Sequence, residues 1–268
     1  MDFRVTMVQM PCNESDPHEN RARARWLLDG YRPVSEREFI ILPELFDIGF
    51  RHSDYKDCEA GVPGPTSEFM ESLAAETGAY VAATGIEQAG NSKYYNTLVV
   101  GSPSGRTVAV YRKIHPFQEE RHVFLGGDRI VAFEARGLKV GVQICYDIRF
   151  PEVTRRMALE GVQLVLIPAA FPDPRSAHWN TLLAARAIEN QLYVAACNRI
   201  GYGFDGKTYF GHSQMVDPWG VVLSRPNSEE RVLSATGDTT AIDYVRRQIT
   251  CLADRSGKSY DQVQWYYE

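Results

Sequence analysis

Short apolar runs alternate with amphipathic segments along most of this chain. The apolar runs, bounded by Gly, Pro or polar residues, predict strands. These strands are expected at residues 3–10, 39–42, 80–87, 97–101, 107–113, 138–144, 163–168, 193–198, 214–217, 221–223 and 231–236. Helices are expected at residues 20–31, 66–77, 152–160, 177–190 and 239–249. Because the two kinds of element interleave without a linker or repeat, we expect one α/β domain over residues 1–268.

Composition narrows the class of protein. The net charge of −5 argues against nucleic acid as the main partner, which requires a basic face. No apolar stretch is long enough for a membrane span, and the first residues are typical of a strand, not a signal peptide. The five cysteines are odd in number, widely spread and never in a Cys-x-x-Cys pair. They favour a reducing cytoplasm over disulfides or a zinc site.

Cys145 stands where the apolar run 138–144 stops. A polar turn follows, and then the predicted helix from residue 152. This strand–turn–helix arrangement can expose one nucleophilic side chain. A nearby helix start favours negative charge, so the sequence predicts a lowered thiol pKa. The alternative is that Cys145 is a small buried hydrophobic residue.

Two other ionisable residues also follow apolar strands. Glu44 follows the run 39–42 and Pro43, and Lys113 ends the run 107–113. Each could alone be a solvated surface charge, as could Glu119 and Glu120 in the next loop. Because strand ends at one edge of an α/β sheet converge, we expect Glu44, Lys113 and Cys145 to meet there. A desolvated Glu44 would suit a general base.

Three motifs in this order resemble those of the nitrilase superfamily of carbon–nitrogen hydrolases. They are LPELF at 42–46, YRKIH at 111–115 and QICYD at 143–147. The resemblance implies a Glu44–Lys113–Cys145 triad and places the family's second glutamate at Glu120, not Glu119. It also implies a four-layer α-β-β-α sandwich whose subunits associate so that two sandwiches stack.

The implied chemistry suits these side chains and requires no cofactor or metal. Cys145 would attack a carboxamide carbon while Glu44 accepts the thiol proton. Lys113 and the backbone N–H of Tyr146 would stabilise the oxyanion. Glu120 would orient Lys113 or the substrate amide, and the partner is expected to be a small-molecule amide.

Substrate choice depends on residues around Cys145. Arg149, four residues further on, would bind a substrate carboxylate, or else form an ion pair with Asp147 or Glu152. Residues 175–191 and 197–199 resemble the omega-amidase group, which implies a short ω-amide with a distal carboxylate, such as 2-oxoglutaramate. Phe171 is expected in the pocket wall.

Other readings stay open. The loop 115–127 is shorter than in many animal omega-amidases and deaminated-glutathione amidases, and it shapes the mouth of the pocket. Deaminated-glutathione amidase and N-carbamoyl amino acid hydrolase are therefore alternative functions. A non-catalytic protein with the same fold is another. The aromatic tail, about residues 250–268, favours a subunit contact in a homodimer or larger homo-oligomer, or else folds back on its own domain.

Overall fold

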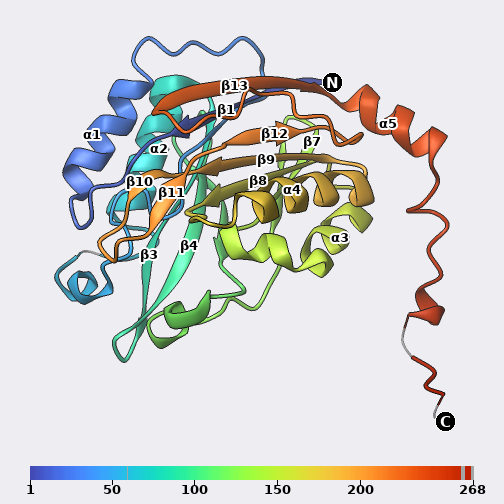
Figure 1. Ribbon diagram of the computed structural model, residues 1–268. Coiled ribbons are helices and arrows are strands. Elements are labelled where there is room, and N and C mark those ends of the chain that lie inside the picture. The colour runs from blue at the N-terminus through green and yellow to red at the C-terminus, as the bar shows by residue number, and fades with distance from the viewer. Residues whose placement is uncertain (59, 261–262, 267–268) are drawn as a thin grey trace.

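The protein contains two β-sheets that pack face to face in a computed structural model, which describes residues 1–58, 60–260 and 263–266 (Figure 1). The first sheet has the order β13 (Arg231–Asp238), β1 (Asp2–Gln9), β2 (Glu38–Ile41), β3 (Tyr80–Gly90), β4 (Lys93–Gly101) and β5 (Thr107–Arg112). The second has the order β12 (Gln214–Val216), β9 (Tyr193–Asn198), β8 (Leu164–Ala169), β7 (Leu138–Val142) and β6 (Ala132–Ala135). A small hairpin joins β10 (Ile200–Tyr202) and β11 (Thr208–Phe210).

Helices cover the outer faces of both sheets. Helices α1 (Pro17–Leu27) and α2 (Pro65–Thr77) pack on the first sheet, and α3 (Pro151–Leu159) and α4 (Ser176–Asn190) pack on the second (Figure 1). Helix α5 (Thr239–Gln248) follows β13. The layers therefore run α-β-β-α, and the predicted α/β class is confirmed. No helix in the described ranges has the length and apolar character that a membrane crossing needs.

Strand β2 shows why the run 39–42 is apolar throughout. Phe39 and Ile41 belong to the core between the two sheets, whereas Ile40 and Leu42 belong to the core under α1 and α2. Successive side chains of a strand point to opposite faces, so a strand covered on both faces needs apolar residues at every position. β2 pairs in parallel with both β1 and β3, as buried strands with helical crossovers do.

Some predicted boundaries were wrong. The first helix begins at Pro17, not residue 20, because the Asp16 side chain accepts a hydrogen bond from the Glu19 N–H and proline is well tolerated in a first turn. Residues 221–223 form only an isolated bridge, between Val222 and Val216, on the far side of a tight turn in which the Gly220 N–H donates to the Asp217 carbonyl. The short strands β6, β10 and β11 had not been predicted.

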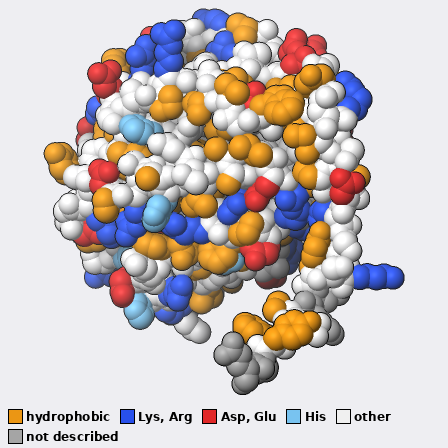
Figure 2. All heavy atoms as spheres, turned by 45° about the vertical axis from the view of Figure 1, so that its right-hand side comes forward, with side chains coloured by type: hydrophobic (Ala, Val, Ile, Leu, Met, Phe, Trp, Pro, Cys, Tyr) orange, Lys and Arg blue, Asp and Glu red, His pale blue; other side chains and the backbone are white. Residues whose placement is uncertain are grey.

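The chain beyond α5 extends away from the rest of the molecule (Figures 1 and 2). Trp265 and Tyr266 are 70% and 85% exposed, so these aromatic residues do not fold back on their own domain. Residues 261–262 and 267–268 of the predicted contact segment lie outside the described residues.

Candidate active site

A buried lysine lies between two glutamates at the centre of the site. The Lys113 Nζ donates to Glu44 Oε1 at 2.7 Å and to Glu120 Oε2 at 2.8 Å. Lys113 and Glu44 side chains are each only 1% exposed. Glu119, in contrast, is exposed and pairs with His122. The structure thus brings Glu120, and not Glu119, to the lysine.

The site lies between two sheets, which corrects the expectation of a single sheet edge. Glu44 follows β2 and Lys113 follows β5, both in the first sheet, whereas Cys145 follows β7 in the second. The ends of these strands meet because the sheets face each other, with β2 and β3 in contact with β8. The residues still converge, but across the core and not along one edge.

Both oxygens of Glu44 are fixed by the protein. The Asn96 amide donates to Oε1 at 2.8 Å, and the backbone N–H of Ala170 donates to Oε2 at 3.0 Å. Asn96 lies on β4, beside β5, so it reaches the carboxylate from the strand next to that of Lys113. A carboxylate held in this way is pre-oriented toward its neighbours. The sequence had not indicated Asn96, because an asparagine within a strand has no signature of its own.

The charges of the cluster depend on one another. Burial disfavours the Lys113 ammonium, but Glu120 and Glu44 outweigh burial and raise its pKa well above the ordinary value. Burial raises the pKa of Glu120, although Lys113 opposes that rise. The lysine therefore stays protonated at neutral pH, as a group that stabilises an oxyanion must.

The Cys145 thiol has a raised pKa, contrary to the prediction of a lowered one. Burial comes first among the causes and the negative charge of Glu44 second, while Lys113 opposes them. The residues after Cys145 form a short 3-10 turn, Cys145–Arg149, and α3 begins only at Pro151. The helix dipole acts within about one turn, so it does not offset Glu44. At neutral pH the Cys145 side chain is therefore a thiol.

Three residues at the cluster have a left-handed backbone conformation. Cys145 has φ 42°, Leu45 after Glu44 has φ 46°, and Gln118 in the Glu120 loop has φ 44°. Left-handed conformations are costly for residues with a Cβ and persist only where the surroundings impose them. The Leu45 N–H, for example, donates to the Thr84 hydroxyl at 2.6 Å. These distortions set the directions in which the site residues leave the backbone.

Asp147 joins the lysine loop to the cysteine loop. Its buried carboxylate accepts from the Tyr111 hydroxyl at 2.7 Å and from the backbone N–H groups of Ile144 and His115, each at 3.1 Å. The His115 ring lies 2.8 Å from the same carboxylate and stacks on Phe150. Asp147 is therefore a positioning residue, and its carboxylate is already occupied.

Arg149 does not form either of the ion pairs considered for it. Within the described chain it pairs with neither Asp147 nor Glu152, and its guanidinium lies 3.4 Å from His178 Nδ1. The guanidinium carbon lies 5.1 Å from the ring centroid of Phe171 and 5.9 Å from that of Tyr146. Arg149 thus packs against aromatic rings with its charge free for a ligand.

The hollow that contains Cys145 combines these groups with apolar walls. It is lined by Phe117, Glu120, Cys145, Tyr146, Arg149, Ala170, Phe171, Pro172 and Arg175. Phe171 is fixed by Asn198, whose side chain accepts from the Phe171 N–H at 2.6 Å and donates to its carbonyl at 3.1 Å. The structure places Tyr146 and Phe171 in the wall, and it adds Phe117 and Arg175, which the sequence had not indicated.

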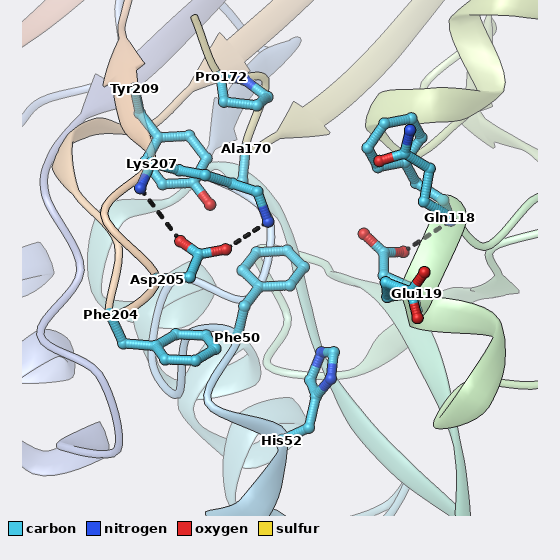
Figure 3. A pocket seen from close by; sticks show the side chains of 12 residues that line it. Phe50, His52, Gln118, Glu119, Ala170, Pro172, Phe204, Asp205, Lys207 and Tyr209 are labelled. Atoms are coloured by element: carbon cyan, nitrogen blue, oxygen red, sulfur yellow. Dashed lines mark hydrogen bonds and ion pairs between the residues drawn. The ribbon is translucent and has the colours of Figure 1, made fainter.

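A wider outer cavity of about 230 Å³ adjoins this hollow and shares Glu120 and Phe117 with it. Figure 3 shows Phe50, His52 and Phe204 on one side of the outer cavity and Gln118 on the other. Asp205 and Lys207, from the turn between β10 and β11, form an ion pair at its rim. The outer cavity therefore combines aromatic and charged walls.

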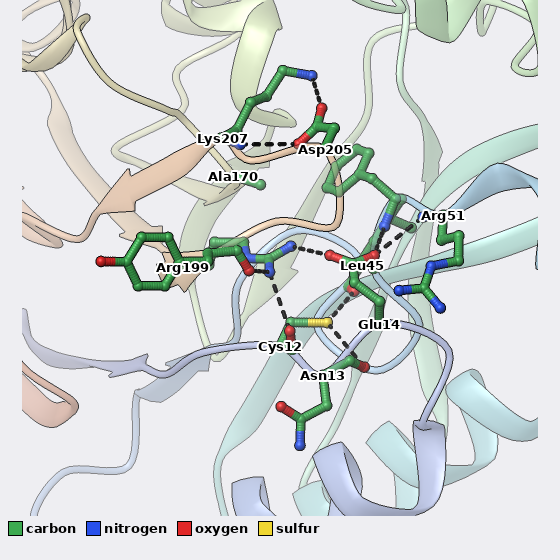
Figure 4. A network of polar contacts seen from close by, with 12 residues as sticks. Cys12, Asn13, Glu14, Leu45, Arg51, Ala170, Arg199, Asp205 and Lys207 are labelled. Atoms are coloured by element: carbon green, nitrogen blue, oxygen red, sulfur yellow. Dashed lines mark hydrogen bonds and ion pairs between the residues drawn. The ribbon is translucent and has the colours of Figure 1, made fainter.

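A buried arginine supports the loop that follows Glu44. Arg199 donates to Glu14 Oε1 at 3.0 Å and to the Cys12 carbonyl at 3.1 Å (Figure 4). Glu14 in turn accepts from the backbone N–H of Phe50 at 2.6 Å, and the Cys12 thiol donates to the Leu45 carbonyl at 3.6 Å. The network holds the Glu44 loop against the second sheet.

Comparison with known proteins agrees with this geometry. Residues 4–247 match the family model described as carbon–nitrogen hydrolase. The 2-oxoglutaramate amidase of Bacillus subtilis (strain 168) is 33% identical over 256 residues, covering 95% of this chain and 98% of the relative. The omega-amidase NIT2 of Xenopus tropicalis is 34% identical over 270 residues, covering 96% of each chain.

A solved structure gives the same result for the fold. XC1258 from Xanthomonas campestris, a CN-hydrolase superfamily protein with an arsenic adduct in its active site, superposes with a TM-score of 0.89 at 29% identity. The alignment covers 96% of this chain and 98% of XC1258. The resemblance to the nitrilase superfamily is confirmed, and the protein belongs to the carbon–nitrogen hydrolase family.

Proposed function

We propose that this protein is an amidohydrolase of the omega-amidase type. Its substrate would be a short carboxylated amide such as 2-oxoglutaramate, which it would convert to 2-oxoglutarate and ammonia. The observation that carries this proposal is the buried Glu44–Lys113–Glu120 cluster beside Cys145, in a hollow that also contains the free Arg149 guanidinium. The names of the Bacillus and Xenopus relatives support the same substrate class.

The first half of the reaction forms a thioester. As the Cys145 sulfur attacks the carboxamide carbon, Glu44 takes the thiol proton. The carbonyl oxygen gains negative charge, which the Lys113 ammonium and the Tyr146 N–H stabilise. Collapse of the tetrahedral intermediate breaks the C–N bond, and Glu44 returns the proton to the departing ammonia.

The second half hydrolyses the thioester. A water molecule attacks the same carbon while Glu44 takes one of its protons, and the oxyanion is stabilised as before. The C–S bond then breaks, and the proton on Glu44 passes to the sulfur, so that the thiol and the free acid result. Glu120 touches Lys113 and holds the ammonium at the position of the developing charge.

Ammonia release from 2-oxoglutaramate tests the function directly. The unaltered enzyme should release ammonia and 2-oxoglutarate in equal amounts, and Cys145→Ala should lose activity to background because no thioester can form. Cys251→Ala is the matched control, since that cysteine is exposed and far along the chain. Failure of the unaltered enzyme to hydrolyse any short carboxylated amide would remove the proposal.

Arg149→Ala should selectively impair the hydrolysis of carboxylated amides. Loss of a paired charge-assisted hydrogen bond is expected to raise KM for 2-oxoglutaramate by about tenfold or more. A neutral amide of the same length should change much less. Steady-state rates on the two substrates measure this difference. If the rates on both substrates fall equally, Arg149 is not the substrate anchor.

A second candidate function is favoured by the outer cavity. Its volume of about 230 Å³ next to the hollow leaves room for a longer substrate, such as deaminated glutathione or an N-carbamoyl amino acid. Parallel rates on these compounds and 2-oxoglutaramate decide between them, and carbon dioxide production would mark the carbamoyl substrate.

The aromatic tail supports a proposal of self-association. Tyr260 is 61% exposed and Trp265 70% exposed, on a segment that stands apart from the main body (Figure 2). Exposed aromatic side chains of this kind favour burial against another subunit. We expect a homodimer or larger homo-oligomer by light scattering, and a smaller species after deletion of residues 250–268. An unchanged mass would contradict this role for the tail.

The free cysteines support a cytoplasmic location. All five are unpaired, and Cys12, Cys145 and Cys197 are buried. Such a chain suits a reducing compartment. Cell fractionation followed by immunodetection checks this proposal, and recovery outside the cytoplasm would contradict it.

A further inference from the structure

Two arginines line the hollow that contains Cys145. Arg149 packs on Phe171, and the Arg175 guanidinium carbon lies 5.4 Å from the ring centroid of Phe117. The Phe117 and Tyr146 rings are themselves 4.8 Å apart. Both cations therefore lie against one aromatic wall of one small hollow.

Neither arginine has a carboxylate partner among the described residues. Arg112 and Arg156, for comparison, form ion pairs with Glu87 and Glu160. Two like charges that share a small, partly dehydrated hollow repel each other, and an anion between them removes this repulsion. The arrangement is the one expected where a ligand supplies the negative charge.

Helix stability does not account for Arg175. It occupies the N-cap position of α4, where Asp, Asn, Ser or Thr would accept a hydrogen bond from the first turn, and it makes no side-chain cap bond. A cation at this end also opposes the helix dipole. An arginine here is therefore unfavourable for the helix.

The backbone nevertheless holds Arg175 firmly. Its N–H donates to the Pro172 carbonyl at 3.3 Å, and its carbonyl accepts from the Trp179 N–H at 3.0 Å. The Asp173 N–H donates to the Thr208 carbonyl of β11 at 2.9 Å. The guanidinium is thus presented to the hollow from a fixed turn.

We infer that Arg175 is a second anchor for the acid end of the substrate and selects 2-oxo acids over 2-amino acids. This inference rests on the proposed function. A carboxylate next to a 2-oxo group offers three acceptor oxygens, so one guanidinium can pair with the carboxylate and the other can bind the remaining oxygen. A 2-ammonium group has no acceptor and would be repelled by both arginines, which disfavours glutamine.

Binding in a Cys145→Ala background tests this inference without turnover. Calorimetry would compare 2-oxoglutaramate with L-glutamine, which differs from it at the 2-position. Arg175→Gln should weaken 2-oxoglutaramate binding by about tenfold to a hundredfold and reduce the preference over glutamine. Arg175→Lys, which keeps the charge but loses the planar fork, should give an intermediate loss. Arg156→Gln, an exposed arginine on α3, should bind as the parent does.

Two outcomes would overturn the role of Arg175. One is unchanged 2-oxoglutaramate binding in Arg175→Gln or Arg175→Lys, and the other is an equal loss for both ligands. No binding of 2-oxoglutaramate to the parent would overturn it as well. Turnover by the enzyme with Cys145 intact is measured separately, so failure of the proposed function is distinguishable. In that active enzyme, Arg175→Gln should raise KM more than it lowers kcat.

Discussion

Glu44→Gln is expected to lower kcat by about a thousandfold, with little change in KM. The glutamine keeps the shape of the side chain and can still accept from Lys113 or Asn96 through its amide oxygen. It cannot take the proton from the Cys145 thiol, nor a proton from the water that hydrolyses the thioester. Both halves of the reaction therefore lose their base. Steady-state ammonia release measures the effect.

The same substitution should lower the pKa of Cys145, because the charge of Glu44 is a cause of its rise, second to burial. Alkylation of Cys145 by iodoacetamide, followed by mass spectrometry across pH, should begin at lower pH in Glu44→Gln. Lower activity together with a larger thiolate fraction would show that Glu44 acts as a base during the reaction and does not merely promote formation of the thiolate. If alkylation of Cys145 in Glu44→Gln begins at the same pH as in the unaltered enzyme, or at a higher pH, the role of Glu44 is contradicted.

Glu87→Gln is the matched control for Glu44→Gln. Glu87 lies on β3, is largely buried, and binds Arg112 and Thr97. The chemical change is the same, but the carboxylate is outside the site. Its kcat should stay within about twofold of the unaltered enzyme.

The sequence predicted the parts of the site that depend on local pattern. Glu44, Lys113 and Cys145 each lie at the end of an apolar or alternating run that becomes a strand. The strand before Glu44 is buried on both faces, whereas the strand before Lys113 alternates between buried and exposed positions. Arg112 and Lys113 also behave as alternation requires, since Arg112 is exposed while Lys113 is buried. Patterns of this kind lie within one segment, so they can be read before the fold is known.

The parts that could not be predicted depend on contacts between distant segments. That Cys145 belongs to a second sheet follows from strand order, which no single run specifies. The raised thiol pKa comes from burial and from Glu44, about a hundred residues earlier in the chain. Asn96 and Asp147 are ordinary polar residues until the fold supplies their partners. Local sequence therefore indicates which groups react, and tertiary packing determines their ionisation and orientation.

The central charge cluster also makes a prediction about stability. Lys113→Met removes the ammonium that lies between Glu44 and Glu120 and leaves two buried carboxylates without it. Breaking a buried ion pair by removal of one partner costs about 3–5 kcal/mol of unfolding free energy. Arg112→Met is the control, because it removes a neighbouring cation whose pair with Glu87 is partly exposed, and it should cost about 1 kcal/mol or less. Urea unfolding at pH 7 measures both.

The pH dependence of Lys113→Met distinguishes lost charge from lost packing. Burial already raises the pKa of Glu120 from its ordinary 4.5, and Lys113 is the group that opposes this rise. Without the lysine, the pKa of Glu120 in the folded state should rise further. A carboxyl whose pKa is raised by folding stabilises the native state below the unfolded pKa, and this contribution is lost as pH rises through the folded pKa. The stability deficit of Lys113→Met should therefore shrink as pH falls from 7 toward 5, and adding Glu120→Gln should recover part of it at pH 7. A deficit of the same size at both pH values would show that the loss is one of packing alone.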